Sequence, residues 1–265
     1  MPVELAYRYF GGEGNPPLVI LHGLLGSSRN WTTAGKLLAR SFEVFALDLR
    51  GHGDSPWAPP PERDYSFKTL AGDVAAWLAA RGVAHPVLLG HSLGGKITMR
   101  LAADQPKLVR ALIVADIAPR DYPPHHAAEF AAMLELDLAK LTSRGEAEKI
   151  LLAKLHDEAM ARFLLTNLVR EADDHFRWRV DVAGLAAALS DLSRSSLKPG
   201  EAYPGPTLFL RGDQSDYVRE GDRPLIAALF PRHQILAIGR AGHNLHVDQP
   251  AAFAAALEYF GMDLP

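Results

Sequence analysis

The sequence contains no cysteine among its 265 residues. Disulfides, thiolate metal ligands and cysteine nucleophiles are therefore excluded. It also lacks an apolar stretch of the length that a membrane-spanning helix requires. The first ten residues, MPVELAYRYF, lack the basic and apolar regions of a signal peptide. We therefore expect a protein without a membrane span, located in the cytoplasm.

An excess of charge of one sign is missing as well. The chain has 28 Lys and Arg against 31 Asp and Glu, a net charge of −3. Because nucleic-acid-binding domains usually carry a basic face, this balance argues against a nucleic-acid partner. Hydrophobic residues make up 48% of the chain, which suffices for a large core without disulfides. The composition predicts a globular protein that acts on a small molecule, and it leaves the oligomeric state open.

Short apolar runs rich in Val, Ile and Leu alternate with helical patterns along the chain. We predict buried strands at residues 17–23, 42–48, 86–92, 109–116, 206–212 and 233–239. Runs of this kind are typical of parallel strands that helices cover on both faces. Helices are predicted near residues 31–40, 67–81, 94–104, 220–230 and 249–260. The alternation predicts an α/β fold with an open, mostly parallel sheet.

Residues 118–199 interrupt this alternation. They contain helical patterns at 129–141 and 147–156 and no clear strand. Residues that break regular structure border the segment, namely Pro119, Pro123, Pro124, Pro199, Gly200, Pro204 and Gly205. We predict a core domain of residues 1–117 and 200–265 and an all-helical cap of residues 118–199 over the carboxyl edge of the sheet. The alternative is a helical layer packed on one face of the sheet.

The segment Gly90-His91-Ser92-Leu93-Gly94 lies between a predicted strand and a predicted helix. A serine on such a sharp turn projects its hydroxyl above the sheet edge, and the crowded backbone requires small residues two positions before and after it. The first amides of the following helix favour negative charge at the same place. We predict that Ser92 is a catalytic nucleophile. The alternative is a glycine-rich turn that only packs or holds a phosphate, although no phosphate-binding glycine pattern is present at a strand end.

A serine esterase also needs backbone donors for the oxyanion and a general base. The amide of Leu93 follows the nucleophile, and the amide of Leu24 lies in a glycine-containing loop after an early predicted strand. We predict these two amides as the oxyanion hole. His243, in the first turn after the last predicted strand, is the predicted base. His246, beside the final helix, is the less favoured alternative.

The chain resembles the α/β-hydrolase superfamily over nearly its whole length. Four segments carry the resemblance, namely HGLLGS (22–27), DLRGHGDS (48–55), GHSLGG (90–95) and AGHNLHVDQP (241–250). Lys96 and the stretch DIAP (116–119) are similar to a branch of small serine esterases, the YbfF type and related hydrolase-domain proteins of mitochondria. The resemblance implies an α/β-hydrolase fold with a helical cap inserted after the sixth strand. It also implies ester hydrolysis through an acyl-serine intermediate with no metal and no organic cofactor. DLRGHGDS is then structural, and His52 within it is not expected to bind a ligand.

The acid of the triad is harder to place. Superfamily members usually carry it in a G-x-x-D-x-x-V pattern after the next-to-last strand, and in that register Ser215 occupies the acid position. We favour Asp116 instead, because the sheet order that the resemblance implies puts its strand beside the one that carries the nucleophile. Asp216 and then Asp213 are the fallback acids, and Ser215 is expected to hydrogen-bond the histidine or Asp116. The alternative for Asp116 is a cap for the chain that enters the insertion.

Apolar side chains are expected to line the substrate pocket. The candidates at helical or loop positions near the predicted site are Leu25, Phe130, Met133, Leu134 and Trp178. Arg120 and Arg179 are the candidate cations if the substrate is anionic. We expect a small-molecule ester or thioester with a short to medium acyl group, and p-nitrophenyl butyrate as a better substrate than the palmitate.

Other activities of the same fold remain alternatives, namely a cofactor-free haloperoxidase, a lipase or a C–C bond hydrolase. A dehalogenase or an epoxide hydrolase would require aspartate at position 92, where this chain has serine. The alternative from a different class is a receptor module that binds a ligand in the pocket without catalysis. Such a module usually has a broken triad, whereas serine and histidine are both present here.

Overall fold

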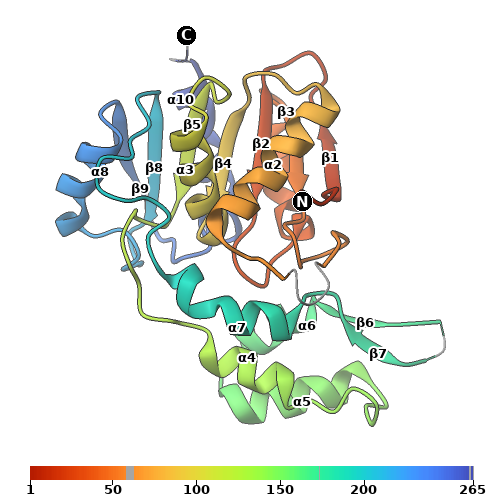
Figure 1. Cartoon of the computed structure of the whole chain (residues 1–265). Coiled ribbons are helices and arrows are strands. Elements are labelled where there is room, and N and C mark those ends of the chain that lie inside the picture. The colour runs from red at the N-terminus through yellow and green to blue at the C-terminus, as the bar shows by residue number, and fades with distance from the viewer. Residues whose placement is uncertain (58–62, 173, 263, 265) are drawn as a thin grey trace.

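The computed structural model describes residues 1–57, 63–172, 174–262 and 264. A central sheet has the strand order β1-β3-β2-β4-β5-β8-β9 (Figure 1). Its strands are β1 (Tyr7–Gly11), β2 (Pro17–Leu21), β3 (Glu43–Leu47), β4 (Val87–His91), β5 (Ala111–Ala115), β8 (Thr207–Gly212) and β9 (His233–Ile238). Every neighbouring pair is parallel except β1 and β3. The predicted mostly parallel sheet is confirmed.

Helices cover both faces of the sheet because both faces of its central strands are apolar. Leu18 and Ile20 of β2 pack with α1 (Thr32–Leu38) and α10 (Pro250–Met262), whereas Val19 and Leu21 point to the opposite core. That opposite core contains α2 (Phe67–Arg81), α3 (Leu93–Asp104) and α8 (Arg223–Leu229). The alternation follows from the period of two along a strand.

Two edge strands differ from the prediction. β1 pairs with β3 at the sheet edge, and it was not predicted because its sequence YRYFG has no apolar run. β9 was predicted to be buried, but it is the other edge strand, and Gln234, Leu236 and Ala237 in it are exposed. The insertion follows β5, the fifth strand along this chain, and not a sixth strand as the resemblance implied.

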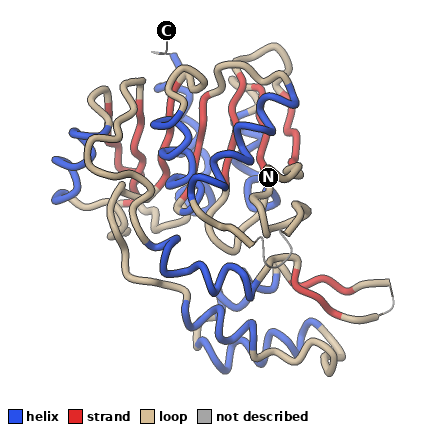
Figure 2. The backbone as a smooth tube through the Cα atoms, in the orientation of Figure 1, coloured by secondary structure: helices blue, strands red, loops and turns tan. Residues whose placement is uncertain are grey.

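The segment between β5 and β8 lies beyond the carboxyl edge of the sheet rather than on one of its faces (Figures 1 and 2). Its helices are α4 (Ala127–Leu134), α5 (Arg144–Leu155), α6 (Glu158–Leu165) and α7 (Val182–Ser193). The prediction of an all-helical segment was wrong, because β6 (Leu168–Arg170) and β7 (Phe176–Trp178) form an antiparallel hairpin. Each of these strands has three residues, which is too short for a periodic pattern to be detected.

None of the described helices combines the length and the apolar character that crossing a membrane would require.

Candidate active site

Ser92 lies on a sharp turn between β4 and α3, with φ 52° and ψ −114°. A positive φ is unfavourable for serine, and such strain is typical of functional sites. The glycines on either side are required by the backbone. A Cβ on Gly90 would lie 2.3 Å from the carbonyl oxygen of Gly94, and a Cβ on Gly94 would lie 2.3 Å from that of Leu21. The turn therefore has the geometry that was predicted for a nucleophile.

Asp116 lies beside His243 at the carboxyl edge of the sheet. The distance from His243 Nδ1 to Asp116 Oδ2 is 2.8 Å. Asp116 is fully buried, and its carboxylate also accepts hydrogen bonds from the Gly212 amide (3.1 Å) and the Ser215 hydroxyl. This contact holds the proton on Nδ1 and leaves Nε2 of His243 as the acceptor. Ser215 thus contacts Asp116, one of its two expected partners.

The two fallback carboxylates lie elsewhere. Asp213 Oδ1 accepts a hydrogen bond from the amide of Ala241 at 3.3 Å, which holds the loop that carries His243. Asp216 is exposed, and its carbonyl oxygen accepts a hydrogen bond from Arg219. Among the described residues, the hydrogen bonds of His243 run to Asp116 and, through its carbonyl oxygen, to His91, and none joins Ser92. Hydrogen bonds between a nucleophile and its base are often long until substrate is bound.

A row of stacked side chains, Tyr217, Tyr122 and Arg120, begins at one face of the His243 ring. Tyr217 stacks on His243 with ring centroids 3.9 Å apart and an interplanar angle of 20°. Tyr122 stacks on Tyr217, and the guanidinium of Arg120 lies 3.9 Å from the Tyr122 ring centroid. Tyr217 thus holds the plane of the His243 ring. Sequence analysis missed Tyr217, although its place two residues after Ser215 was a usable signal.

Two other histidines lie behind His243. His91 Nε2 is 2.8 Å from the carbonyl oxygen of His243, to which it donates if the proton is on that nitrogen. His246 is buried and stacks on Trp31 with centroids 4.0 Å apart. Burial and, to a smaller extent, the nearby His243 lower the pKa of His246 to about 3. Burial likewise lowers the pKa of His91 well below its ordinary value. Both rings are thus neutral supports, and His246 has the wrong environment for a base.

We expect the variant His246→Phe to weaken the loss of stability in acid. The pKa of His246 is lowered in the folded chain to about 3, so below pH 6.5 the unfolded chain binds a proton that the folded chain does not. Its contribution is complete above pH 6.5 and is lost as the pH falls toward 3. At pH 5 the loss is about 2 kcal/mol. Urea unfolding at pH 7.5 and pH 5 should show a difference in unfolding free energy smaller by about that amount.

The exposed residue His85 supplies the control for this measurement. Its φ of 47° suits asparagine, so His85→Asn should keep the fold and the pH dependence of the wild type. If His246→Phe and the wild type lose the same free energy between pH 7.5 and pH 5, His246 is not the titrating group.

Two histidines also fix the loop that was predicted to form the oxyanion hole. His22 Nδ1 contacts the carbonyl oxygen of Gly23 at 2.8 Å, and its Nε2 accepts from the amide of Leu49 at 3.0 Å. His52 Nε2 accepts from the amide of Leu25 at 3.3 Å. Burial lowers the pKa of His52 to about 3, so the ring is a neutral acceptor. His52 is therefore engaged within the loop structure.

Leu24 and Leu93, whose amides were predicted to form the oxyanion hole, lie at the cavity beside Ser92. Both residues line one cavity with Ser92, and neither amide donates a hydrogen bond to any group in the described part of the chain. Leu93 is the first residue of α3, where amides have no partner within the helix. Two unpaired donors next to a strained serine can stabilise an oxyanion.

The cavity beside Ser92 is small, with a volume of about 50 Å³. Besides the core residues, it is lined by side chains from the segment after β5 and from α7, among them Tyr122, Pro123, His125, His126, Leu189 and Leu192. Tyr217, which stacks on the ring of His243, lines it as well. His125 and His126 thus lie at the site.

The predicted pocket residues lie elsewhere. Leu25, Phe130, Met133 and Trp178 are all buried in the hydrophobic core, and Leu134 is exposed. The indole Nε1 of Trp178 donates to the carbonyl oxygen of Met133 at 3.2 Å, which ties the hairpin to α4. The prediction of these pocket residues is not supported, because none of them lines the cavity. Apolar residues at helical spacing, such as Phe130 and Met133, pack between elements in the core instead. The candidate cations are also paired, Arg120 with Asp222 and Arg179 with Asp54.

Lys96 connects α3 to the end of α7. Its buried ammonium donates hydrogen bonds to the carbonyl oxygens of Leu192 (3.0 Å), Ser193 (2.8 Å) and Arg194 (2.7 Å). A cation is favoured at the carboxyl end of a helix. Burial lowers the pKa of Lys96 to about 7, and Asp121 opposes this shift.

Within the described residues, no group of histidine and carboxylate side chains is arranged to hold a metal ion.

Comparison with known proteins adds relatives for the whole chain. A family model described as the alpha/beta hydrolase fold matches residues 16–250. The sn-1-specific diacylglycerol lipase ABHD11 of Mus musculus is 36% identical over 268 residues, which cover 98% of this chain and 85% of that protein. Esterase YbfF of Escherichia coli (strain K12) is 31% identical over 249 residues, 94% of each chain.

Solved structures show the same likeness. A marine microorganism esterase with 34% sequence identity superposes with a TM-score of 0.92 and covers 97% of this chain and 99% of that one. An E-2-(acetamidomethylene)succinate hydrolase with 23% identity and a TM-score of 0.77, which covers 97% of this chain and 95% of its own, shares the fold.

Proposed function

Because the chain belongs to the alpha/beta hydrolase fold family, we propose that it is a serine esterase that cleaves short to medium acyl esters through Ser92, His243 and Asp116. The predicted fold and the resemblance to YbfF-type esterases are confirmed, and the chain is a hydrolase. The observation that carries the proposal is the contact between His243 Nδ1 and the buried Asp116 carboxylate, at the same sheet edge as the strained Ser92 turn.

In the proposed reaction, the Ser92 hydroxyl attacks the ester carbonyl carbon while Nε2 of His243 takes the hydroxyl proton. The carbonyl oxygen becomes an oxyanion and accepts hydrogen bonds from the amides of Leu24 and Leu93. Asp116 stabilises the imidazolium that forms, and Tyr217 holds the plane of its ring. The imidazolium then protonates the departing alcohol oxygen, and the acyl group remains on Ser92. Water then attacks the acyl carbon while His243 takes a proton from it. His243 returns this proton to the Ser92 oxygen, and the carboxylic acid is released.

We assign residues 118–199 to a cap and residues 1–117 and 200–265 to the core. In support, the segment after β5 and α7 supplies Tyr122, His125 and Leu192 to the cavity beside Ser92. The wall of this cavity is largely apolar. Lys96, a cation among its described lining residues, is already bound to three carbonyl oxygens. Both features favour a neutral ester or thioester as the substrate. The name of the mouse relative adds acylglycerol esters to the candidate substrates.

A fluorophosphonate probe tests the proposal. We expect a covalent adduct on Ser92, located by mass spectrometry of the digested protein, and hydrolysis of p-nitrophenyl butyrate at least tenfold faster than of the palmitate. The reason is that a cavity of about 50 Å³ next to Ser92 holds only the first carbons of an acyl chain. A protein that forms no adduct and cleaves neither ester would be a receptor module or another activity of the fold instead.

A further inference from the structure

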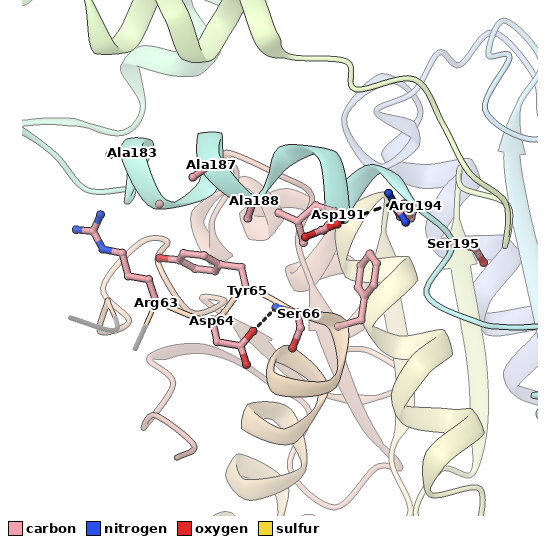
Figure 3. A pocket seen from close by; sticks show the side chains of 13 residues that line it. Arg63, Asp64, Tyr65, Ser66, Ala183, Ala187, Ala188, Asp191, Arg194 and Ser195 are labelled. Carbon is pink, nitrogen blue, oxygen red and sulfur yellow. Dashed lines mark hydrogen bonds and ion pairs between the residues drawn. The ribbon is translucent and has the colours of Figure 1, made fainter. Parts of the chain in front are cut away.

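A second and larger cavity lies between α7 and the chain that leads into α2 (Figure 3). Its volume is about 530 Å³, against about 50 Å³ for the cavity beside Ser92. One wall is a face of α7 with little side-chain volume, formed by Ala183, Gly184, Ala187 and Ala188. The opposite wall includes Tyr65 and Phe67. We call this cavity the α7 groove.

Specific contacts join the two walls of the α7 groove near the start of α7. The buried Asp181 carboxylate accepts hydrogen bonds from the Tyr65 hydroxyl (2.7 Å) and the Gly184 amide (3.0 Å). A Cβ on Gly184 would lie 2.2 Å from Asp181 Oδ2 and 2.9 Å from the Tyr65 ring. The start of α7 and the opposite wall are therefore joined closely at Gly184, while Ala183 and Ala187 remain exposed along the groove.

The charged side chains around the α7 groove have partners within the chain. Arg63 pairs with Asp181 at 3.3 Å, and Arg194 lies 3.8 Å from Asp191. Asp64 accepts a hydrogen bond from the amide of Ser66 at 2.8 Å, which Figure 3 shows as a dashed line. A charged ligand would have to displace these partners. The small apolar wall of α7 instead matches a neutral hydrocarbon chain.

The α7 groove adjoins the cavity beside Ser92. Leu192, near the end of α7, lines both cavities. Phe67 lines the groove, Lys96 lines the smaller cavity, and the Lys96 ammonium lies 5.8 Å from the Phe67 ring centroid. Leu192 and the Lys96–Phe67 pair thus lie between the two cavities, and a chain from Ser92 would reach the groove by passing them.

The sheet order indicates whether the acyl part (the acyl arm) or the alcohol part (the alcohol arm) of the ester points toward the α7 groove. The wall with Tyr65 and Phe67 comes from the chain between β3 and β4, whereas Tyr217 follows β8 and His243 follows β9. In the sheet, β3 lies on one side of β4, and β8 and β9 lie on the other. His243 must protonate the alcohol oxygen, so the alcohol arm lies on its side. The acyl arm then extends toward the groove.

We propose that the α7 groove is a subsite for the distal carbons of the acyl chain, so that the substrates are neutral esters of medium-chain fatty acids. The inference rests on the proposed esterase function. Short acyl groups end in the small cavity, and chains of about eight carbons pass Leu192 and bury their last carbons against the alanines of α7.

The test is the acyl-chain preference of Ala187→Trp, which fills the α7 groove. The matched control is Ser190→Trp, an exposed position of α7 that does not line the groove. We expect the ratio of kcat/KM for p-nitrophenyl octanoate over p-nitrophenyl acetate to fall at least tenfold in Ala187→Trp and to stay at the wild-type value in Ser190→Trp. The ratio for octyl acetate over ethyl acetate, which lengthens the alcohol arm, should not change in either variant.

Two results would overturn the subsite. An octanoate ratio in Ala187→Trp equal to that of the wild type would show that the acyl chain does not enter the groove. A fall in the octyl acetate ratio instead would place the alcohol arm there. Both results leave the esterase function intact, because the wild type still cleaves esters. A wild type that cleaves no ester and forms no fluorophosphonate adduct would reject the esterase function, and the subsite with it.

Discussion

Replacing Ser92 with alanine is expected to lower kcat for p-nitrophenyl butyrate by a factor of about 10⁶ and to abolish the fluorophosphonate adduct. Loss of the nucleophile in a serine hydrolase has an effect of this size, and the activity that remains reflects the oxyanion hole and substrate binding. Ser92 is held at φ 52° by the turn, and alanine fits the same space, so the fold should be kept. Steady-state kinetics and intact-protein mass spectrometry measure the two effects.

Ser190→Ala is a suitable control, because this serine is exposed on α7 and should retain wild-type turnover and labelling of Ser92. A Ser92→Ala protein with more than about one hundredth of the wild-type kcat would mean that hydrolysis does not proceed through an acyl group on Ser92.

The variant Asp116→Asn is expected to lower kcat by about 10⁴, since an amide in place of the carboxylate favours the wrong tautomer of the histidine in a triad. Its position is suited to the change. Asp116 has φ 52°, a conformation that asparagine tolerates, and the Gly212 amide can still donate to its remaining oxygen. The loss should appear in kcat more than in KM, because the carboxylate acts on the imidazolium of the transition state.

Asp216→Asn and Asp213→Asn are the matched controls for the acid. Asp216 is exposed, so its variant should keep the wild-type kcat. Asp213 holds the amide of Ala241 at 3.3 Å, so its variant should lose less than tenfold through movement of the loop that carries His243. Near-normal turnover in Asp116→Asn together with a loss of several orders of magnitude in Asp216→Asn would reverse the assignment.

The parts of the site that are predictable from sequence are those fixed over a few residues. The turn around Ser92 requires glycine at positions 90 and 94 for steric reasons, so a short pattern between a strand and a helix is enough to identify it. The position of Asp116 depends on sheet order, because it reaches His243 across 127 residues of sequence. That order was available only through the resemblance to a family, and composition and periodicity do not contain it.

The walls of the cavities were not predictable from periodicity. Phe130 and Met133 have the same spacing on a helix whether they face a core or a pocket, and here they face the core. The alanines of the α7 groove gave no signal, because a small residue is noticed only when its opposite wall is known. Tyr217 was not predictable from periodicity either, since its stacking on His243 depends on how two loops meet. Both features depend on tertiary contacts between distant segments.

The ammonium of Lys96 fixes the carboxyl end of α7. Rotation of this helix away from the core would part its last carbonyl oxygens from the Lys96 ammonium and leave buried polar groups without their partners. The carboxyl end of α7 is thus anchored to the same helix that begins at Ser92. The amino end is held as well, because the buried Asp181 carboxylate accepts a hydrogen bond from the Tyr65 hydroxyl, so a chain in the groove would lie beside a helix that is fixed at both ends.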